Sequence, residues 1–354
     1  MRVVFLLAGL AACASREIPR EGPREVSPAA APRDAALRDG PATDAAAKAV
    51  ALDTGAPASP AGPMFEAVVE TLFVEAADIG RVRAACPETL AVDARVRCAH
   101  DERYRGDASA AGLAYELWAQ FGIVAGVETA HVMAGGYRGH IRIVPAVPMG
   151  DDRKHLAWIL QAVKEIDAVF VALARRGPAP TTPAVYRYKP LTLRFMRSVA
   201  ARTPSAYASG WMVAWNLDGS LHTSAEAARD TLVHEIFHLN DQAHGSADDA
   251  WSEVALGATF DAVTRKCGVR TACLATYSPN DTQVRGGTYY SFQPGNGVRE
   301  YAAELALRYF REQRAVLHSL PAPRSFKCGP AENARSWASV RDEFFAGRDL
   351  VPAC

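Results

Sequence analysis

The sequence predicts an α+β fold, and three observations support this prediction. Residues 153–177 and 299–317 carry apolar side chains at helical spacing. Residues 139–148 and 191–199 alternate and contain β-branched side chains, as strands do. The predicted strands are followed by two helices that bear acidic and histidine residues. Strands followed by helices in this order are typical of the α+β class.

Helices and strands are mixed in the first part of the folded region. The spacing of apolar residues predicts helices at 64–86, 112–123 and 153–177, the last of which ends in basic residues. Strands are expected at 139–148, which a proline closes, and at 191–199.

A strand and two helices are expected in the second part. The strand at 210–217 ends in an Asp-Gly turn. Residues Thr223–Glu226 match a capping box, and a helix is expected over 225–244, with Gly245 as its stop residue. Turn signals fill residues 246–299, the last expected helix is 299–317, and the C-terminal stretch is expected to be irregular.

Length and charge limit the class of protein. The chain has 354 residues, 49% of them hydrophobic, which suits one large or two smaller globular domains. The 39 basic residues balance the 39 acidic residues, so charge gives no reason to expect a nucleic-acid partner. We expect a monomer.

The first residues indicate export. Residues 3–12 form an apolar run of ten after Arg2, too short to span a bilayer but typical of a signal peptide. The run ends in LAAC, residues 10–13, which resembles the bacterial lipobox. That resemblance implies that Cys13 is lipidated and that the protein is anchored in the cell envelope, at the outer membrane or the periplasmic face. The alternative is a plain secretory signal with an incidental cysteine.

Composition divides the rest of the chain. Residues 13–62 are rich in Pro, Ala, Gly and charge, so they cannot bury enough apolar surface to offset their ordering entropy. We expect them to form a disordered tether after the signal peptide, residues 1–12. The folded part is expected to comprise an N-terminal subdomain of helices and strands, 63–200, whose role the sequence does not indicate, and a subdomain that carries the motif described next, 201–354.

The cysteines indicate disulfides. Apart from Cys13 there are six, an even number that suits three bridges in an exported chain. Neighbours in the sequence favour three pairs, although six cysteines allow fifteen pairings. A thiolate metal site is the competing interpretation, but the chain has no C-x-x-C pair. The favoured pairs are Cys86–Cys98, Cys267–Cys273 and Cys328–Cys354.

The sequence HEIFH, residues 234–238, has the composition of a zinc site. On a helix, His234 and His238 are stacked neighbours and can offer two imidazole nitrogens to one ion. Zinc lowers the pKa of a bound water toward about 7, and Glu235 can then take its proton. Two histidine ligands and a glutamate base on one helix are the chemical features of the H-E-x-x-H motif. The alternative is an ordinary amphipathic helix with two hydrogen-bonded histidines.

His244 is one candidate for the third zinc ligand. The spacing H-E-x-x-H-x-x-x-x-x-H resembles the metzincin motif, in which a glycine turn brings the third histidine back to the metal. Here that position is Asp241, which adopts left-handed geometry less readily than glycine. Metzincins also have a methionine turn after the motif, and no methionine follows His244.

Glu300 is the other candidate and the favoured one. Glu300 and Glu304 are four residues apart and share a helix face. The segment EYAAE, residues 300–304, followed by an apolar helix, resembles the second zinc-binding segment of gluzincins of the anthrax lethal factor and Pro-Pro endopeptidase type. That resemblance implies Glu300 as a zinc ligand and Glu304 as hydrogen-bond partner of a ligating histidine. The alternative is a solvated acidic stripe.

The same resemblance implies a tyrosine before that helix. In these gluzincins it stabilises the oxyanion, and a phenol suits this role because it is neutral near pH 7. Tyr290 is the favoured candidate and Tyr289 the next, although their spacing to Glu300 exceeds that of the family. Arg285 or Arg299 is a further possible donor.

Taken together, these resemblances imply a zincin-like metallopeptidase domain that hydrolyses peptides or proteins in the cell envelope. We expect Glu235 to activate water, with strand 191–199 or 210–217 holding the substrate, by analogy with zincins. Two alternatives remain. One is an amidohydrolase of cell-wall peptide, and the other is a binding lipoprotein whose zincin body is structural.

Overall fold

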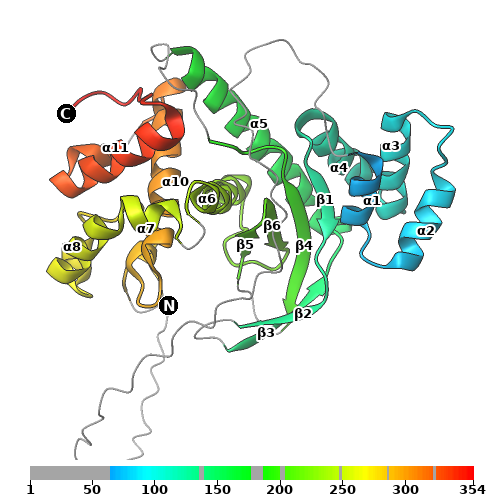
Figure 1. Cartoon of the computed structure of the whole chain (residues 1–354), viewed down its shortest axis with the longest axis horizontal. Helices are drawn as coiled ribbons and strands as arrows, with labels where there is room; N and C mark the ends of the chain where they lie inside the picture. The colour runs from blue at the N-terminus through cyan, green and yellow to red at the C-terminus, as the bar shows by residue number, and fades with distance from the viewer. Residues whose placement is uncertain are drawn as a thin grey trace, which may run out of the picture. The chain divides into compact units, whose positions relative to one another are not determined.

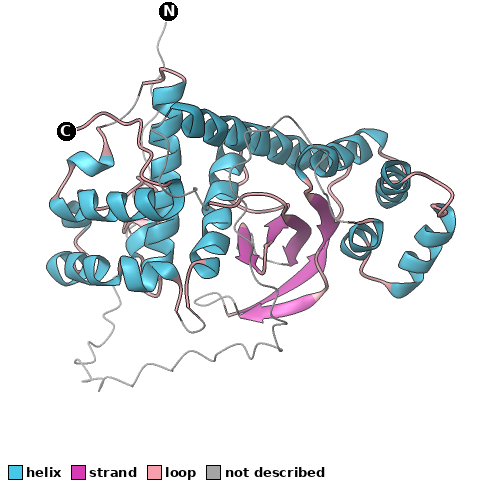
Figure 2. Ribbon diagram, turned by 45° about the horizontal axis from the view of Figure 1, so that its top comes forward, coloured by secondary structure: helices cyan, strands magenta, loops and turns pink. Residues whose placement is uncertain are grey.

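The computed structural model describes residues 64–134, 139–176, 186–199, 204–246, 249–284, 287–321 and 324–354. These residues belong to one compact unit, Ala49–Cys354, with mixed helices and strands, so the α+β prediction is confirmed (Figures 1 and 2). The predicted signal peptide, lipidated Cys13 and tether lie outside the described residues, as does Arg285.

A six-stranded mixed sheet forms the centre of this unit. Its strand order is β2-β3-β4-β6-β5, and β1 pairs in parallel with the first half of β4. Strand β4 is also parallel to β6, whereas β3 pairs antiparallel with the second half of β4 and β5 pairs antiparallel with β6. The strands are β1 (Val124–Val127), β2 (His131–Ala134), β3 (His140–Pro145), β4 (Thr192–Val199), β5 (Ala206–Ser209) and β6 (Met212–Asn216).

The expected strands β3, β4 and β6 are therefore confirmed, whereas β1, β2 and β5 were not expected. The expected subdomain boundary at residue 200 falls between β4 and β5, two strands of this one sheet. Neither strand proposed to hold substrate is at the sheet edge, because β4 and β6 both have neighbours on two sides. The edge strand beside β6 is β5.

Four helices before the sheet pack around their own apolar cluster. They are α1 (Phe65–Leu72), α2 (Ala76–Ala85), α3 (Val92–Arg103) and α4 (Ala108–Phe121). The single helix expected over 64–86 is wrong, because the backbone is extended at Phe73 and Glu75 and this break lets Phe73 enter the cluster. Helix α1 lies so close to β1 that a Cβ on Gly126 would be 1.9 Å from the Thr71 carbonyl oxygen.

Three long helices follow in the chain: α5 (Arg153–Arg176) and α6 (Ala225–Ala243), which lie next to the sheet, and α10 (Val298–Leu317), which packs against both of them. All three were expected, and α6 packs against α5, α10 and β5. Helix α6 begins at Ala225, as expected, but its cap is Ser224 rather than Thr223, because the Ser224 side chain accepts the hydrogen bond from the Ala227 N–H. No helix in the described part of the chain is sufficiently long and apolar to cross a membrane.

The remaining helices occupy regions that the sequence predicted as loops. Between α6 and α10 lie α7 (Trp251–Ala255), α8 (Gly257–Cys267), α9 (Thr271–Leu274) and the short η3 (Tyr290–Phe292). The C-terminal stretch, expected to be irregular, contains η4 (Phe326–Cys328) and α11 (Ala331–Phe345). Figure 1 shows α7, α8 and α11 grouped around α10 on the side of the sheet opposite to α1–α4.

The three predicted disulfides are confirmed. Cys86–Cys98 connects the end of α2 to α3, and Cys267–Cys273 connects α8 to α9. Cys328–Cys354 ties the C-terminal residue to η4. Each pair has a Cα–Cα distance between 5.4 and 5.8 Å, which is usual for a bridge.

Candidate metal centre

Helix α6 supplies the two histidines of the candidate metal centre. Ser224 caps its N-terminus, and the helix is buried over most of its length because α5, α10 and β5 surround it. His234 and His238 are one turn apart on the same face, with imidazole ring centroids separated by 4.8 Å. Surrounding helices therefore hold both rings in place.

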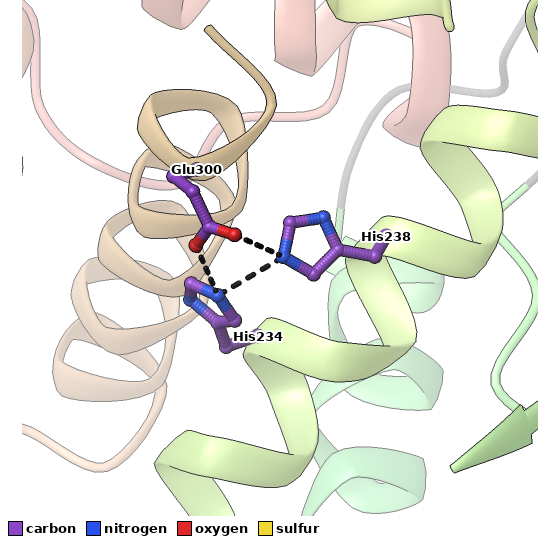
Figure 3. Close-up of side chains that lie close together, drawn as sticks. All are labelled: His234, His238 and Glu300. Atoms are coloured by element: carbon purple, nitrogen blue, oxygen red, sulfur yellow. Dashed lines mark hydrogen bonds and ion pairs between the residues drawn. The ribbon is translucent and has the colours of Figure 1, made fainter. Parts of the chain in front are cut away.

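Helix α10 supplies a carboxylate to the same point. The Glu300 Oε2 atom lies 3.2 Å from His234 Nε2, and Glu300 Oε1 lies 3.7 Å from His238 Nε2. The two Nε2 atoms are 3.1 Å apart. Figure 3 shows the three side chains pointing toward one another from two neighbouring helices.

These three side chains can hold a metal ion. One potential ligand atom from each residue lies within 4.8 Å of the others. An ion bound tetrahedrally at about 2.1 Å has ligand atoms about 3.4 Å apart, close to the separations between His234, His238 and Glu300. Two imidazoles and one carboxylate also leave the fourth tetrahedral position open, which is the arrangement of catalytic rather than structural zinc sites.

The charges of His234, His238 and Glu300 favour a cation between them. Burial would lower the pKa of His234, but hydrogen bonds with Glu300 and Glu304 raise this pKa well above its usual value. Burial would raise the pKa of Glu300, but His234 and His238 hold it well below its usual range. An ionised carboxylate facing imidazole nitrogens is therefore stabilised by positive charge, whether a proton or a metal ion supplies it.

Glu304 holds the far side of the His234 ring. Its Oε1 atom lies 3.2 Å from His234 Nδ1, and the carboxylate is buried one helical turn from Glu300. With a metal ion bound, an N–H at Nδ1 would donate to this carboxylate and leave the lone pair of Nε2 free for the ion. Glu304 thus lies within hydrogen-bond distance of His234, one of the two histidines of the motif.

Glu235 and Tyr290 line a pocket of about 290 Å³ beside the three residues. Burial raises the pKa of Glu235, and the charges of His234 and His238 oppose this rise. Burial, followed by the negative charges of Glu300 and Glu235, also raises the pKa of the Tyr290 phenol, so it remains a hydrogen-bond donor. The Tyr290 and His234 ring centroids are 6.0 Å apart.

Tyr289 and Arg299 differ from Tyr290 in their surroundings. Tyr289 is buried in the main apolar core and does not line this pocket. Arg299 does line the pocket, and its guanidinium forms a salt bridge of 3.1 Å with Glu253. Of the two candidate tyrosines, Tyr290 is therefore the one that lines the pocket.

His244 lies away from this group. Its Nδ1 atom is 2.8 Å from Glu343 Oε1, and its ring packs against Phe344. Helix α6 continues through Asp241, so the chain makes no turn that would bring His244 back toward His234. The Asp241 carboxylate instead accepts hydrogen bonds from the backbone N–H and the hydroxyl of Ser252 in α7.

The sequence analysis missed the residues that form the opposite wall of the pocket. Ala206, Tyr207 and Ala208 of edge strand β5 line it. Tyr207 donates from its hydroxyl to Glu128 Oε2 at 3.2 Å, which fixes its position on the sheet. A run of four residues with two alanines gives little strand signal, so only the pairing of β5 with β6 reveals this wall.

The fold and the site define an α+β protein with a His-His-Glu group, drawn from two helices, that can bind a metal ion. No protein-family model, no curated protein and no solved structure matches the chain.

Proposed function

We propose that this protein is a zinc-dependent peptidase of the gluzincin-like type. The observation that carries the proposal is the convergence of His234, His238 and Glu300 beside a buried Glu235 at one pocket. A structural metal site requires no carboxylate at the position of Glu235 and leaves no ligand position open. Both features suit hydrolysis.

Each side chain has a distinct role in this proposal. His234, His238 and Glu300 would hold the ion, which would supply Lewis-acid polarisation and lower the pKa of a water molecule. Glu235 takes a proton from the attacking water and later delivers it to the leaving amine. Tyr290 donates a hydrogen bond to the oxygen on which negative charge develops.

Strand β5 supports a peptide as the substrate. In the described part of the sheet it pairs only with β6, so its other edge presents backbone N–H and C=O groups. An extended peptide can add to such an edge by main-chain hydrogen bonds. The small side chains of Ala206 and Ala208 line the pocket there and leave room for substrate side chains.

The location that we propose is the cell envelope, with an N-terminal lipid anchor. The proposal rests on the lipobox-like residues 10–13. Three disulfides within the folded unit fit an oxidising compartment outside the cytosol.

The Glu235→Gln variant tests the proposed chemistry. The amide keeps the shape of the side chain but cannot accept a proton from water, so kcat should fall about 100- to 10,000-fold. Zinc content, measured by elemental analysis, should stay at that of the wild type, because Glu235 is not a ligand in this proposal. A peptide-library digest read by mass spectrometry measures the activity.

Glu343→Gln is the matched control, because Glu343 lies outside the pocket and pairs with His244. We expect it to keep both zinc and activity. Full activity in Glu235→Gln would remove Glu235 as the base, and wild-type protein that binds no zinc would contradict the proposed function itself.

A further inference from the structure

A single buried asparagine stands behind Glu304. Asn280 lies in the loop between α9 and η3 and is only 3% exposed. Its side-chain Nδ2 atom donates to Glu304 Oε2 at 2.9 Å and to the Glu304 backbone oxygen at 2.8 Å. Both N–H groups of the amide are therefore used on one residue of α10.

The other end of the same amide meets a cation. The Arg311 Nη1 atom donates to Asn280 Oδ1 at 2.8 Å, and the Arg311 guanidinium also pairs with Asp230 of α6. A flipped amide would place Oδ1 against the Glu304 carboxylate and Nδ2 against Arg311. Such a flip would turn the contacts on both sides repulsive, so the surroundings fix the orientation of Asn280.

The arrangement requires an asparagine at this position. The side chain must donate to Glu304 on one side and accept from Arg311 on the other, and an amide does both without carrying charge. An aspartate would still accept from Arg311. It would also place a second carboxylate oxygen against Glu304, where a donor is needed.

The contacts form a continuous line to the metal centre. Asn280 holds one oxygen of Glu304, and the other oxygen of Glu304 faces His234 Nδ1. The orientation of the Glu304 carboxylate sets the tilt of the His234 ring, and the ring directs Nε2 toward Glu300. A small rotation of Glu304 would therefore misdirect a ligand atom.

We propose that Asn280 is a positioning residue that sets the metal affinity of the His234-His238-Glu300 group by fixing Glu304. This inference rests on the proposed function, since it requires that the group binds zinc. Asn280 contacts none of the three ligands, and the sequence shows only turn signals in its loop. Partners of metal-ligating histidines typically change metal affinity about 10- to 100-fold when they are removed.

Zinc titration of full-length variants, in competition with a chromophoric chelator, tests the inference. In Asn280→Ala, Glu304 loses a fixed donor, and we expect zinc to bind about tenfold more weakly than to wild type. Asn280→Asp is nearly isosteric and keeps the acceptor for Arg311. We expect Asn280→Asp to lose at least as much zinc affinity as Asn280→Ala. If Asn280→Ala does not fold, the Asn280→Asp variant tests the inference by itself.

Asn333→Ala is the matched control. Asn333 is equally buried and donates to the Thr276 backbone oxygen, but it contacts no residue of the metal centre. Its thermal stability should fall while its zinc affinity remains that of wild type, which separates positioning from general loss of packing. Wild-type protein that binds no zinc would overturn the proposed function and this inference together. If wild type binds zinc and Asn280→Asp binds it equally well, only this inference is overturned.

Discussion

Three glutamates, Glu235, Glu300 and Glu304, lie around the two histidines. Each glutamate has different neighbours, and its acid–base properties differ accordingly. Burial is the main cause that raises the pKa of Glu235, and no cationic side chain in the described part of the chain donates a hydrogen bond to it. The two imidazoles hold the pKa of Glu300 down, and Glu304 is tied between His234 and Asn280. A carboxyl with a raised pKa suits proton transfer, whereas an ionised one suits ligation of a cation. The roles in the proposal follow this division.

The choice of third ligand can be tested at a single residue. Among the described residues, Glu300 is the one carboxylate that faces both Nε2 atoms. Glu300→Ala removes it, so zinc affinity should fall by more than about 100-fold, exceeding the usual loss of an outer partner. His244→Ala removes a histidine paired with Glu343 and should leave zinc affinity unchanged. Metal retention after dialysis against a weak chelator measures both variants. Loss of zinc in His244→Ala alone would reverse the assignment.

The sequence reveals residues whose spacing has a local meaning and misses residues that act only through tertiary contact. His234 and His238 share a helix face because of their spacing, and Glu300 is suggested by its pairing with Glu304 on the next long helix. Asn280 lies among ordinary turn residues, and its contact with Glu304 arises only when its loop packs against α10. No local pattern predicts that contact.

At the level of elements, the longest helices and the longest strand were among the successful predictions. Helices α5, α6 and α10 and strand β4 have enough turns or alternations for the hydrophobic period to be clear. Helices α7 and α9 contain only five and four residues, and the turn signals around them dominated the prediction. Helix α11 is longer, but it was hidden by an expectation that the disulfide-linked C-terminal stretch is irregular.

One capping residue connects several elements and provides a prediction at this scale. Asp107 caps α4 by accepting from the Ala110 N–H at 3.0 Å, and it also accepts from the Gly150 N–H and from Arg153 at the start of α5. Asp107→Ala leaves these donors without an acceptor. We expect the free energy of unfolding, measured by urea titration, to fall by about 2 kcal/mol.

Asp101→Ala is the control for that experiment. Asp101 forms an exposed pair with Arg97 on the same helix and has no capping role. Its loss should cost less than about 0.5 kcal/mol, as exposed ion pairs of this spacing contribute little. Equal effects of the two variants would contradict the linking role of Asp107.

Across the whole molecule, three buried histidines make the free energy of unfolding depend on pH. His100 lies in the helical cluster of α1–α4, whereas His155 and His222 lie on either side of the α5–β6 contact, where Trp215 hydrogen-bonds one ring and stacks on the other. Burial is the main cause that lowers the pKa of each from 6.5 to about 4. Charging any of them in the folded state is therefore unfavourable.

The sign of the pH dependence follows from these values. In the unfolded chain these histidines bind protons near pH 6.5, whereas in the folded chain they bind protons only near pH 4. Their stabilisation is fully present above pH 6.5 and is lost as the pH falls toward 4, by up to about 3 kcal/mol for each histidine. Urea titrations across this range, with chelator present to exclude metal effects, should show the decline. His100→Leu should have a shallower decline, and a flat wild-type curve would contradict the prediction.

The distance along the chain between the ligands determines when an ion can enter the site. His234 and Glu300 are 66 residues apart, and they meet only because α6 packs against α10. In a nascent or unfolded chain, of these three residues only His234 and His238 are near each other. Two imidazoles without the carboxylate would bind an ion weakly. Under the proposed function, the ion would then bind only after α6 has packed against α10. It would have to reach the folded protein, in the compartment where folding is completed.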